Sequence, residues 1–232
     1  MDNLENTEIV EKNEKGKRTL KILFSVLLFG GLWGILEATL GTLLHMPFVP
    51  GTMFLASTTI MVPIAYFLMG ACYKRTETFR SVFYMGVLAA AIKSLSCLIF
   101  HMSFNPVYHI LLESLFMGLA LLAIRPKKVI SFAGLGTVIL ANTSYQAVGT
   151  FLRVNVMTTT RRVFMENFEK YTFKFNCVAI LYTFAVGAII FGVLKLAEKY
   201  NWNFSKVEKV IFHPAFAGSV AAVAVVLTLV IR

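Results

Sequence analysis

The chain has 232 residues, of which 57% are hydrophobic and only 15% are charged, and its formal net charge is +10. A soluble domain has a charged fraction of about one quarter, so this composition excludes an ordinary soluble domain and predicts an integral membrane protein. The positive charges lie between apolar runs, as membrane topology requires, and no basic motif with interleaved aromatic residues indicates a nucleic-acid partner.

Seven apolar segments are long enough to cross a bilayer. They are expected at residues 21–45, 51–72, 81–101, 106–124, 129–152, 175–197 and 213–231. The pattern predicts an all-α integral membrane protein, a bundle of six to seven transmembrane helices. Its expected parts are a flexible cytoplasmic tail (residues 1–20), a six-helix transmembrane core (residues 21–198), and a cytoplasmic loop with an extra C-terminal helix (residues 199–232).

Lysine and arginine are concentrated in the N-terminal tail and in the second, fourth and sixth loops, whereas the first and third loops contain neither. The positive-inside rule therefore predicts a cytoplasmic N-terminus and outward-facing first and third loops. The fifth loop, residues 153–174, is basic although alternation places it outside. It could form an amphipathic helix at the membrane interface.

Two stretches of the chain resemble one another, WGILEATLGTLLHMPFVP at residues 33–50 and AAAIKSLSCLIFHMSFNP at residues 89–106. In register, both end in the pattern H-M-x-F-x-P, and Glu37 falls on Lys93. The match predicts that segments one and two and segments three and four are repeated helical hairpins. Segments five and six echo the pattern only faintly, and chance similarity is the better explanation there, with a third copy as the alternative.

Polar side chains recur at one depth in the outer half of the predicted bundle. Glu37 and Lys93 each precede a histidine by eight residues, which puts both roughly 12 Å below the outer helix ends. Glu113 lies at nearly the same depth on the fourth segment. We predict a ligand-binding layer made of Trp33, Glu37, His45, Lys93, His101, His109, Glu113, Asn142, Tyr145, Gln146 and Tyr182.

The alternative to a binding layer is an internal salt bridge from Lys93 to Glu37 or Glu113 that only fixes helix packing. Two carboxylates and one ammonium do not balance, so either one glutamate is protonated or a positive group completes the set. Histidines near the outer end could bind a transition metal, but no H-x-x-x-H pair occurs, and neither a metal nor another cofactor is expected.

Two further patterns bear on function. Gly30, Gly34 and Ala38 form a small-residue face on the first segment, which allows close helix approach within the chain or, as we predict, with a partner membrane protein. No nucleophile elbow, zinc-protease motif, P-loop or dinucleotide fingerprint occurs, so the chain is not expected to be an enzyme.

The run GGLWGILEATLGTLLHMPFVPGTMFLASTT, residues 30–59, resembles the substrate-binding (S) components of energy-coupling-factor vitamin transporters, or a closely similar membrane family. The shared pattern is G-x-x-W-G-x-x-E-x-x-L-G, then LH and PF-x-x-G, followed by AAAIK and ILLES, and it covers about residues 20–125. The resemblance implies a six-helix bundle in the bacterial plasma membrane with a ligand pocket near its outer surface. It also implies that the small-residue face docks on a transmembrane coupling subunit that works with two ATPase subunits.

The expected function is therefore to bind a small solute, a vitamin or cofactor precursor, for uptake energised by a partner ATPase module. One alternative is a stand-alone secondary transporter or channel in which the two glutamates carry protons or cations. Another is a membrane scaffold without transport activity.

Overall fold

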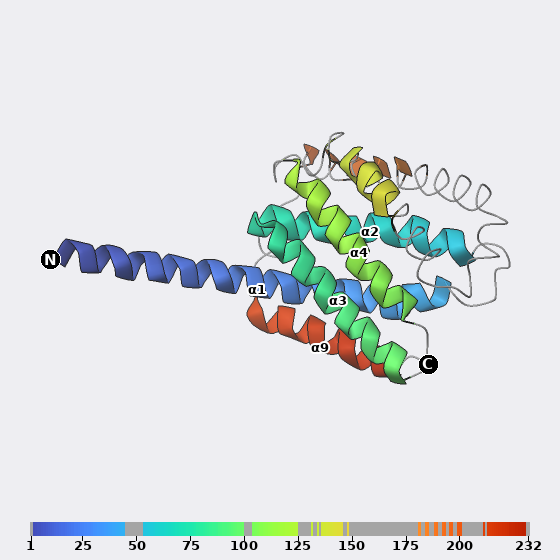
Figure 1. Cartoon of the computed structure of the whole chain (residues 1–232), viewed down its shortest axis with the longest axis horizontal. Helices are drawn as coiled ribbons and strands as arrows, with labels where there is room; N and C mark the ends of the chain where they lie inside the picture. Colours follow the sequence, from blue (N-terminus) through green and yellow to red (C-terminus); the bar gives the residue numbers. More distant parts are fainter. Residues whose placement is uncertain are drawn as a thin grey trace.

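The part of the chain that the structure describes is helical. The computed structural model describes the backbone of residues 2–44, 53–99, 104–124, 131, 134, 136–145, 148, 181, 184–185, 188–189, 192–193, 195–196, 199–200, 211 and 213–230. Its continuous helices are α1 (Asp2–Leu44), α2 (Met53–Thr76), α3 (Phe79–Ile99), α4 (Asn105–Leu122) and α9 (Pro214–Val230) (Figure 1). Residues 136–145 form a further helical stretch. The all-α class is confirmed.

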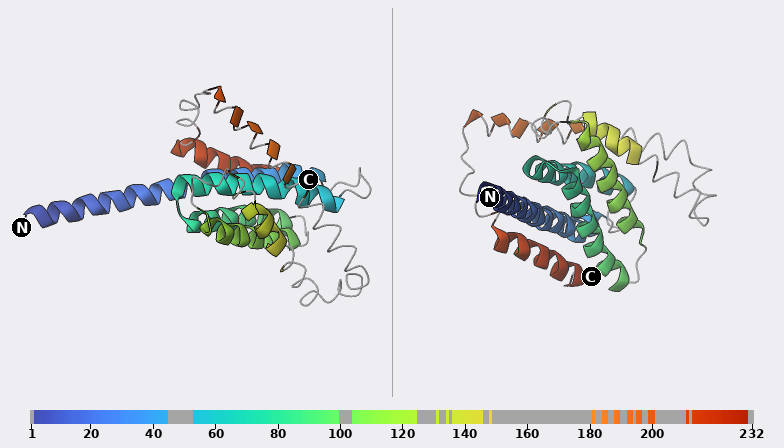
Figure 2. Two further views of the ribbon diagram at one scale, coloured as in Figure 1. Left: turned by 90° about the horizontal axis from the view of Figure 1, so that it is seen from above. Right: turned by 60° about the vertical axis from the view of Figure 1, so that its left-hand side comes forward.

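The helices lie side by side, and α1 to α4 run alternately in opposite directions (Figures 1 and 2). α3 is central to the packing, because it contacts α1, α2, α4 and α9. α1 also packs against α2 and α9. Consequently α1 and α3 end, and α4 begins, at the same end of the bundle, which is the right-hand end in Figure 1.

The expected flexible tail is helical in the structure. Residues 2–20 continue into the rest of α1, and this part of the helix projects beyond the other helices (Figure 1). The side chains of residues 11–20 are all exposed. They support the helix locally, since Lys17 and Glu14 form an ion pair at 3.8 Å and the Thr19 hydroxyl donates to the Lys15 carbonyl at 3.0 Å.

Two helical stretches of the described residues are long and apolar enough to cross a membrane, Glu11–Thr39 and Phe79–Ile99. Pro106–Leu122 and Pro214–Leu227 are apolar but shorter. These helix lengths agree with a location in a membrane. They support two membrane-spanning helices among the described residues, and not the predicted bundle of six to seven.

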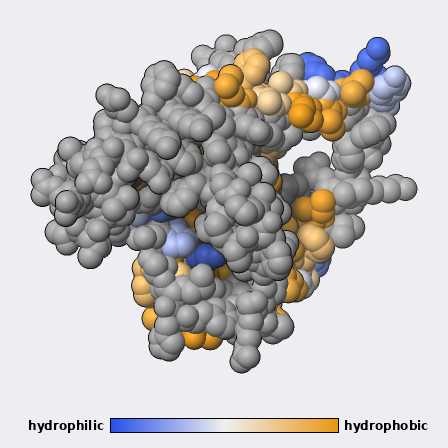
Figure 3. All heavy atoms as spheres, turned by 90° about the vertical axis from the view of Figure 1, so that its right-hand side faces the viewer, coloured by the Kyte–Doolittle hydropathy of each residue, from blue (hydrophilic) through white to orange (hydrophobic). Residues whose placement is uncertain are grey.

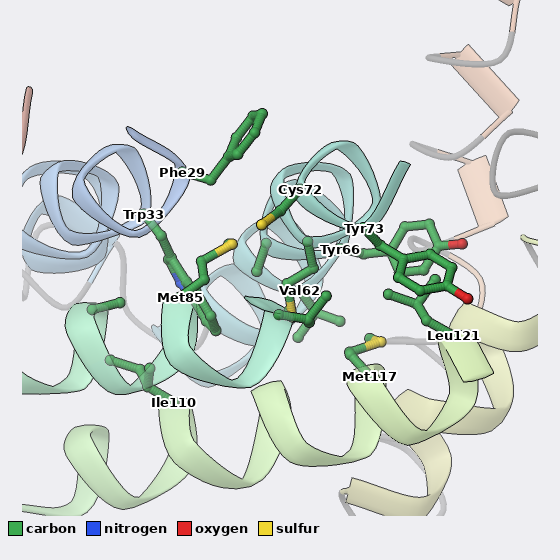
Figure 4. Packing of buried hydrophobic residues seen from close by; sticks show 14 of the residues in the cluster. Phe29, Trp33, Val62, Tyr66, Cys72, Tyr73, Met85, Ile110, Met117 and Leu121 are labelled. Carbon is green, nitrogen blue, oxygen red and sulfur yellow. The ribbon is translucent and has the colours of Figure 1, made fainter. Parts of the chain in front are cut away.

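The hydrophobic core lies where α1, α2, α3 and α4 meet. Figure 4 shows Trp33 of α1 reaching toward Met85 of α3 and Ile110 of α4, while the side chains of α2 lie next to Met117 and Leu121 of α4. Trp33, Met85, Met117 and Leu121 have at most 1% of their surface exposed. Methionine fills irregular gaps of this kind because its side chain is unbranched and flexible.

Glycines set the distance between neighbouring helices at two contacts. A Cβ atom added to Gly31 of α1 would lie 2.9 Å from the main-chain Cα of Ala221 in α9. A Cβ added to Gly86 of α3 would overlap Ser114 of α4. Neither neighbour is the movable end of a long side chain, so any larger residue would push the two helices apart.

We therefore expect Gly86→Ala to lower the free energy of unfolding by about 1–3 kcal/mol, the usual cost of overpacking. The matched control is Gly16→Ala, because nothing lies within 4 Å of a Cβ at that exposed helical position. Gly16→Ala is expected to raise stability by about 0.5–1 kcal/mol through helix propensity. Thermal unfolding of the purified variants in detergent checks both, and equal midpoints would contradict the proposed contact.

Candidate functional site

The structure brings Glu37 and Lys93 together. The Lys93 ammonium, on α3, donates a hydrogen bond of 3.2 Å to the main-chain carbonyl oxygen of Glu37 on α1, and both side chains are partly buried. The positions that coincide in the two similar stretches are thus neighbours in space. This bond is to the main chain, so it is not the ammonium–carboxylate salt bridge that the sequence left open.

Glu113 of α4 lies near this pair. The carboxyl groups of Glu37 and Glu113 are close enough to repel each other. The Glu113 side chain is only 6% exposed, and its Oε1 atom has no hydrogen-bond partner in the part of the chain that the structure describes. A buried carboxyl oxygen without a donor costs free energy, so this position favours a proton or a positively charged neighbour.

His109 and Tyr145 form a direct contact on the side of Glu113 where α4 begins. The Tyr145 hydroxyl and the His109 Nδ1 atom are 2.7 Å apart, and the two rings meet edge to face with centroids separated by 5.7 Å. His109 comes from the first turns of α4, and Tyr145 is the last residue of the described stretch 136–145. The bond therefore fixes this stretch against α4.

Asn142 belongs to the same stretch and lies one helical turn before Tyr145. Its side chain is 1% exposed, and no described residue donates a hydrogen bond to its Oδ1 atom. Buried amide oxygens are normally paired. Asn142 thus supplies a second buried oxygen acceptor whose partner is not among the described residues.

Trp33 was predicted to line the ligand-binding layer, and the structure places it in the hydrophobic core, 0% exposed, one turn before Glu37 on α1. Its indole N–H is buried without an acceptor among the described residues. Figure 4 shows the ring directed from α1 toward α3 and α4. Its bulk therefore supports the helix contact beneath the layer.

The remaining predicted layer residues lie outside the described residues. They are His45, His101, Gln146 and Tyr182. Within the described ranges, no three histidine, cysteine, aspartate or glutamate side chains cluster so that they could hold a metal ion.

The small-residue face of α1 packs against α3 inside the chain, which is the alternative to the predicted partner interface. A Cβ on Gly30 would lie 3.0 Å from Leu88 of α3, and one on Gly34 would lie 2.7 Å from Ile92 of the same helix. Ala38, at 7% exposure, is also buried. α3 covers the face because small residues let two helices approach as readily within one chain as between chains.

Tyr66 is a residue that the sequence analysis missed. Its buried hydroxyl, on α2, donates a hydrogen bond of 3.2 Å to the Gly134 carbonyl, just before the stretch 136–145. The signal was a single hydroxyl within the apolar residues 60–72 of α2, because a buried tyrosine hydroxyl needs a hydrogen-bond partner. Tyr66 ties α2 to the segment that carries Asn142 and Tyr145.

Comparison with models of known protein families, with curated proteins and with solved structures finds no match to this chain. The site is therefore interpreted from its own geometry.

Removing the Tyr145 hydroxyl tests the contact that fixes this part of the site. We expect Tyr145→Phe to destabilise the protein by about 1 kcal/mol, because the bond to His109 is lost in a half-buried setting. Tyr84→Phe is the matched control, since Tyr84 is 51% exposed. An equal melting temperature for the two variants would contradict a stabilising role for the His109–Tyr145 bond.

Proposed function

We propose that the chain is a multi-pass membrane protein that binds a small solute at the layer of Glu37, Lys93 and Glu113 and presents it for uptake. In this proposal the membrane is the bacterial plasma membrane, and the N-terminus is cytoplasmic. The solute is a vitamin or cofactor precursor, and a partner module with ATPase subunits supplies the energy.

The apolar surface of the helices supports the membrane setting. Side chains of α3 that point away from the bundle include Val87, Leu95 and Leu98, which is 60% exposed. Figure 3 views the bundle from the end where α1 and α3 finish. The described residues on this face are mostly hydrophobic, with hydrophilic atoms near the centre and at the upper right. Lipid solvates such surfaces, whereas water does not.

One observation carries the binding role: charged side chains are retained inside an apolar bundle, and one carboxyl oxygen among them lacks a partner in the described chain. Ionisable groups within apolar membrane helices are costly and mark ligand or ion sites. A scaffold would need only paired polar groups. The layer lies near the end of α1 and α3 that the loop charges predict to face outward.

The second candidate is a stand-alone proton- or cation-coupled transporter. The buried carboxyl of Glu113, which interacts with the carboxyl of Glu37, favours it, because such a pair can take up and release a proton or cation. The covered small-residue face removes one argument for a docked coupling subunit, so an energising partner would use another surface.

The experiment is purification of the tagged protein from its native host in mild detergent, with mass spectrometry of retained small molecules and proteins. We expect the wild-type chain to retain a small molecule and Lys93→Met to lose it while still folding, because the ammonium no longer joins α3 to Glu37. Lys74→Met is the control, since Lys74 is exposed at the end of α2.

Each outcome of this purification assigns a function. Recovery of a membrane subunit together with ATPase subunits supports the energised uptake system. A chain recovered alone that moves solute in liposomes along an ion gradient supports the second candidate. Equal retention by wild type and Lys93→Met, or no retained molecule and no flux, would overturn solute binding at this layer.

A further inference from the structure

Two buried oxygen acceptors lie on neighbouring elements. They are Oε1 of Glu113, whose side chain is 6% exposed, and Oδ1 of Asn142, whose side chain is 1% exposed. Within the described part of the chain neither atom has a hydrogen-bond partner. A buried acceptor without a donor is unfavourable, so the arrangement is expected to gain from a donor that none of the described residues supplies.

The hydrogen bonds of the bundle place these two residues at one level. Tyr145 bonds to His109 near the start of α4, while Gly134 is held by Tyr66 of α2 toward the other end, so the stretch 136–145 runs antiparallel to α4. From the His109–Tyr145 bond, Glu113 is four residues farther along α4. Asn142 is three residues back along its own stretch. Each is about one turn from that bond along its helix, roughly 6 Å for Glu113 and roughly 4.5 Å for Asn142.

Among the described residues, two carboxyl groups and one ammonium lie near these acceptors. Glu37 and Glu113 repel each other, and Lys93 is the cation next to Glu37. With both carboxyls ionised, the three side chains sum to one negative charge. One positive charge at the Glu113 end would neutralise the layer, and N–H donors would satisfy its two oxygen acceptors.

We propose that the solute bound at this layer carries one positively charged nitrogen with N–H donors, an ammonium or guanidinium group. This nitrogen group donates to Oε1 of Glu113 and Oδ1 of Asn142, and Glu37 adds its negative charge from α1. The hydrogen bond from Lys93 to the Glu37 carbonyl oxygen holds α1 against α3. The positive charge of Lys93 also repels a second cation. The inference rests on the proposed solute-binding function and narrows its substrate class to cationic amines.

The test is the thermal unfolding of the purified full-length chain in three chloride salts at one ionic strength. Methylammonium carries a positive charge and N–H donors, tetramethylammonium has the same charge without donors, and sodium has neither a nitrogen nor a donor. We expect methylammonium to raise the midpoint by about 2–4 °C over the other two salts, because a ligand stabilises the state it binds.

Variants locate the effect. Glu113→Gln removes the charge and Asn142→Leu removes the acceptor, so the methylammonium shift is expected to disappear in both. Glu77→Gln, an exposed carboxyl at the turn after α2, is expected to retain it. Equal midpoints in the three salts, or a shift that persists in Glu113→Gln, would overturn the inference, and the wild-type comparison decides even if a variant does not fold.

Failure of the cationic-amine inference can be distinguished from failure of the proposed solute-binding function. A small molecule that copurifies with wild type but not with Lys93→Met, and that lacks a cationic nitrogen, would overturn the amine specificity and leave solute binding in place. The absence of both a copurified molecule and a methylammonium shift would remove both.

Discussion

The close packing of α1 against α3 is the contact on which the rest of the structure depends. Gly30 and Gly34 bring no side chains to it, so Leu88 and Ile92 of α3 lie against the backbone of α1. At this separation the Lys93 ammonium reaches a main-chain oxygen of α1. Because α3 also contacts α2, α4 and α9, the same approach sets the position of the whole bundle.

Burying the polar layer lowers the stability of the fold, and the burial of the apolar core must offset this loss. Trp33, Glu113 and Asn142 each have a buried polar atom without a partner among the described residues, and an unpaired atom of this kind costs about 1–3 kcal/mol. A stable domain has a margin of only about 5–15 kcal/mol, so three such atoms are a large share of it. Local departures of this kind concentrate at functional sites. The proposed solute would pair with the two oxygen acceptors and leave the indole N–H as a feature of the core.

The sequence predicted well those features that repeat along the chain. Apolar runs located α2, α3, α4 and α9 within a few residues but missed the helical start of α1, and the similarity of two stretches put Glu37 at the level of Lys93. It could not say which atom of Glu37 the ammonium meets, because helical rise gives depth and not side-chain conformation. Nor could it tell that α3 covers Gly34, since a small-residue face fits an internal helix and a partner helix equally well.

The projecting start of α1 has a mechanical consequence. α1 has 43 residues and no proline, so it is a single rod of about 65 Å that joins the exposed residues 11–20 to Glu37 without a hinge. A load applied to its exposed end would tilt or rotate the end that carries the carboxyl group. A displacement of the N-terminal extension would thus be transmitted along α1 to Glu37, and α1 would pivot about its contacts with α3 and α9.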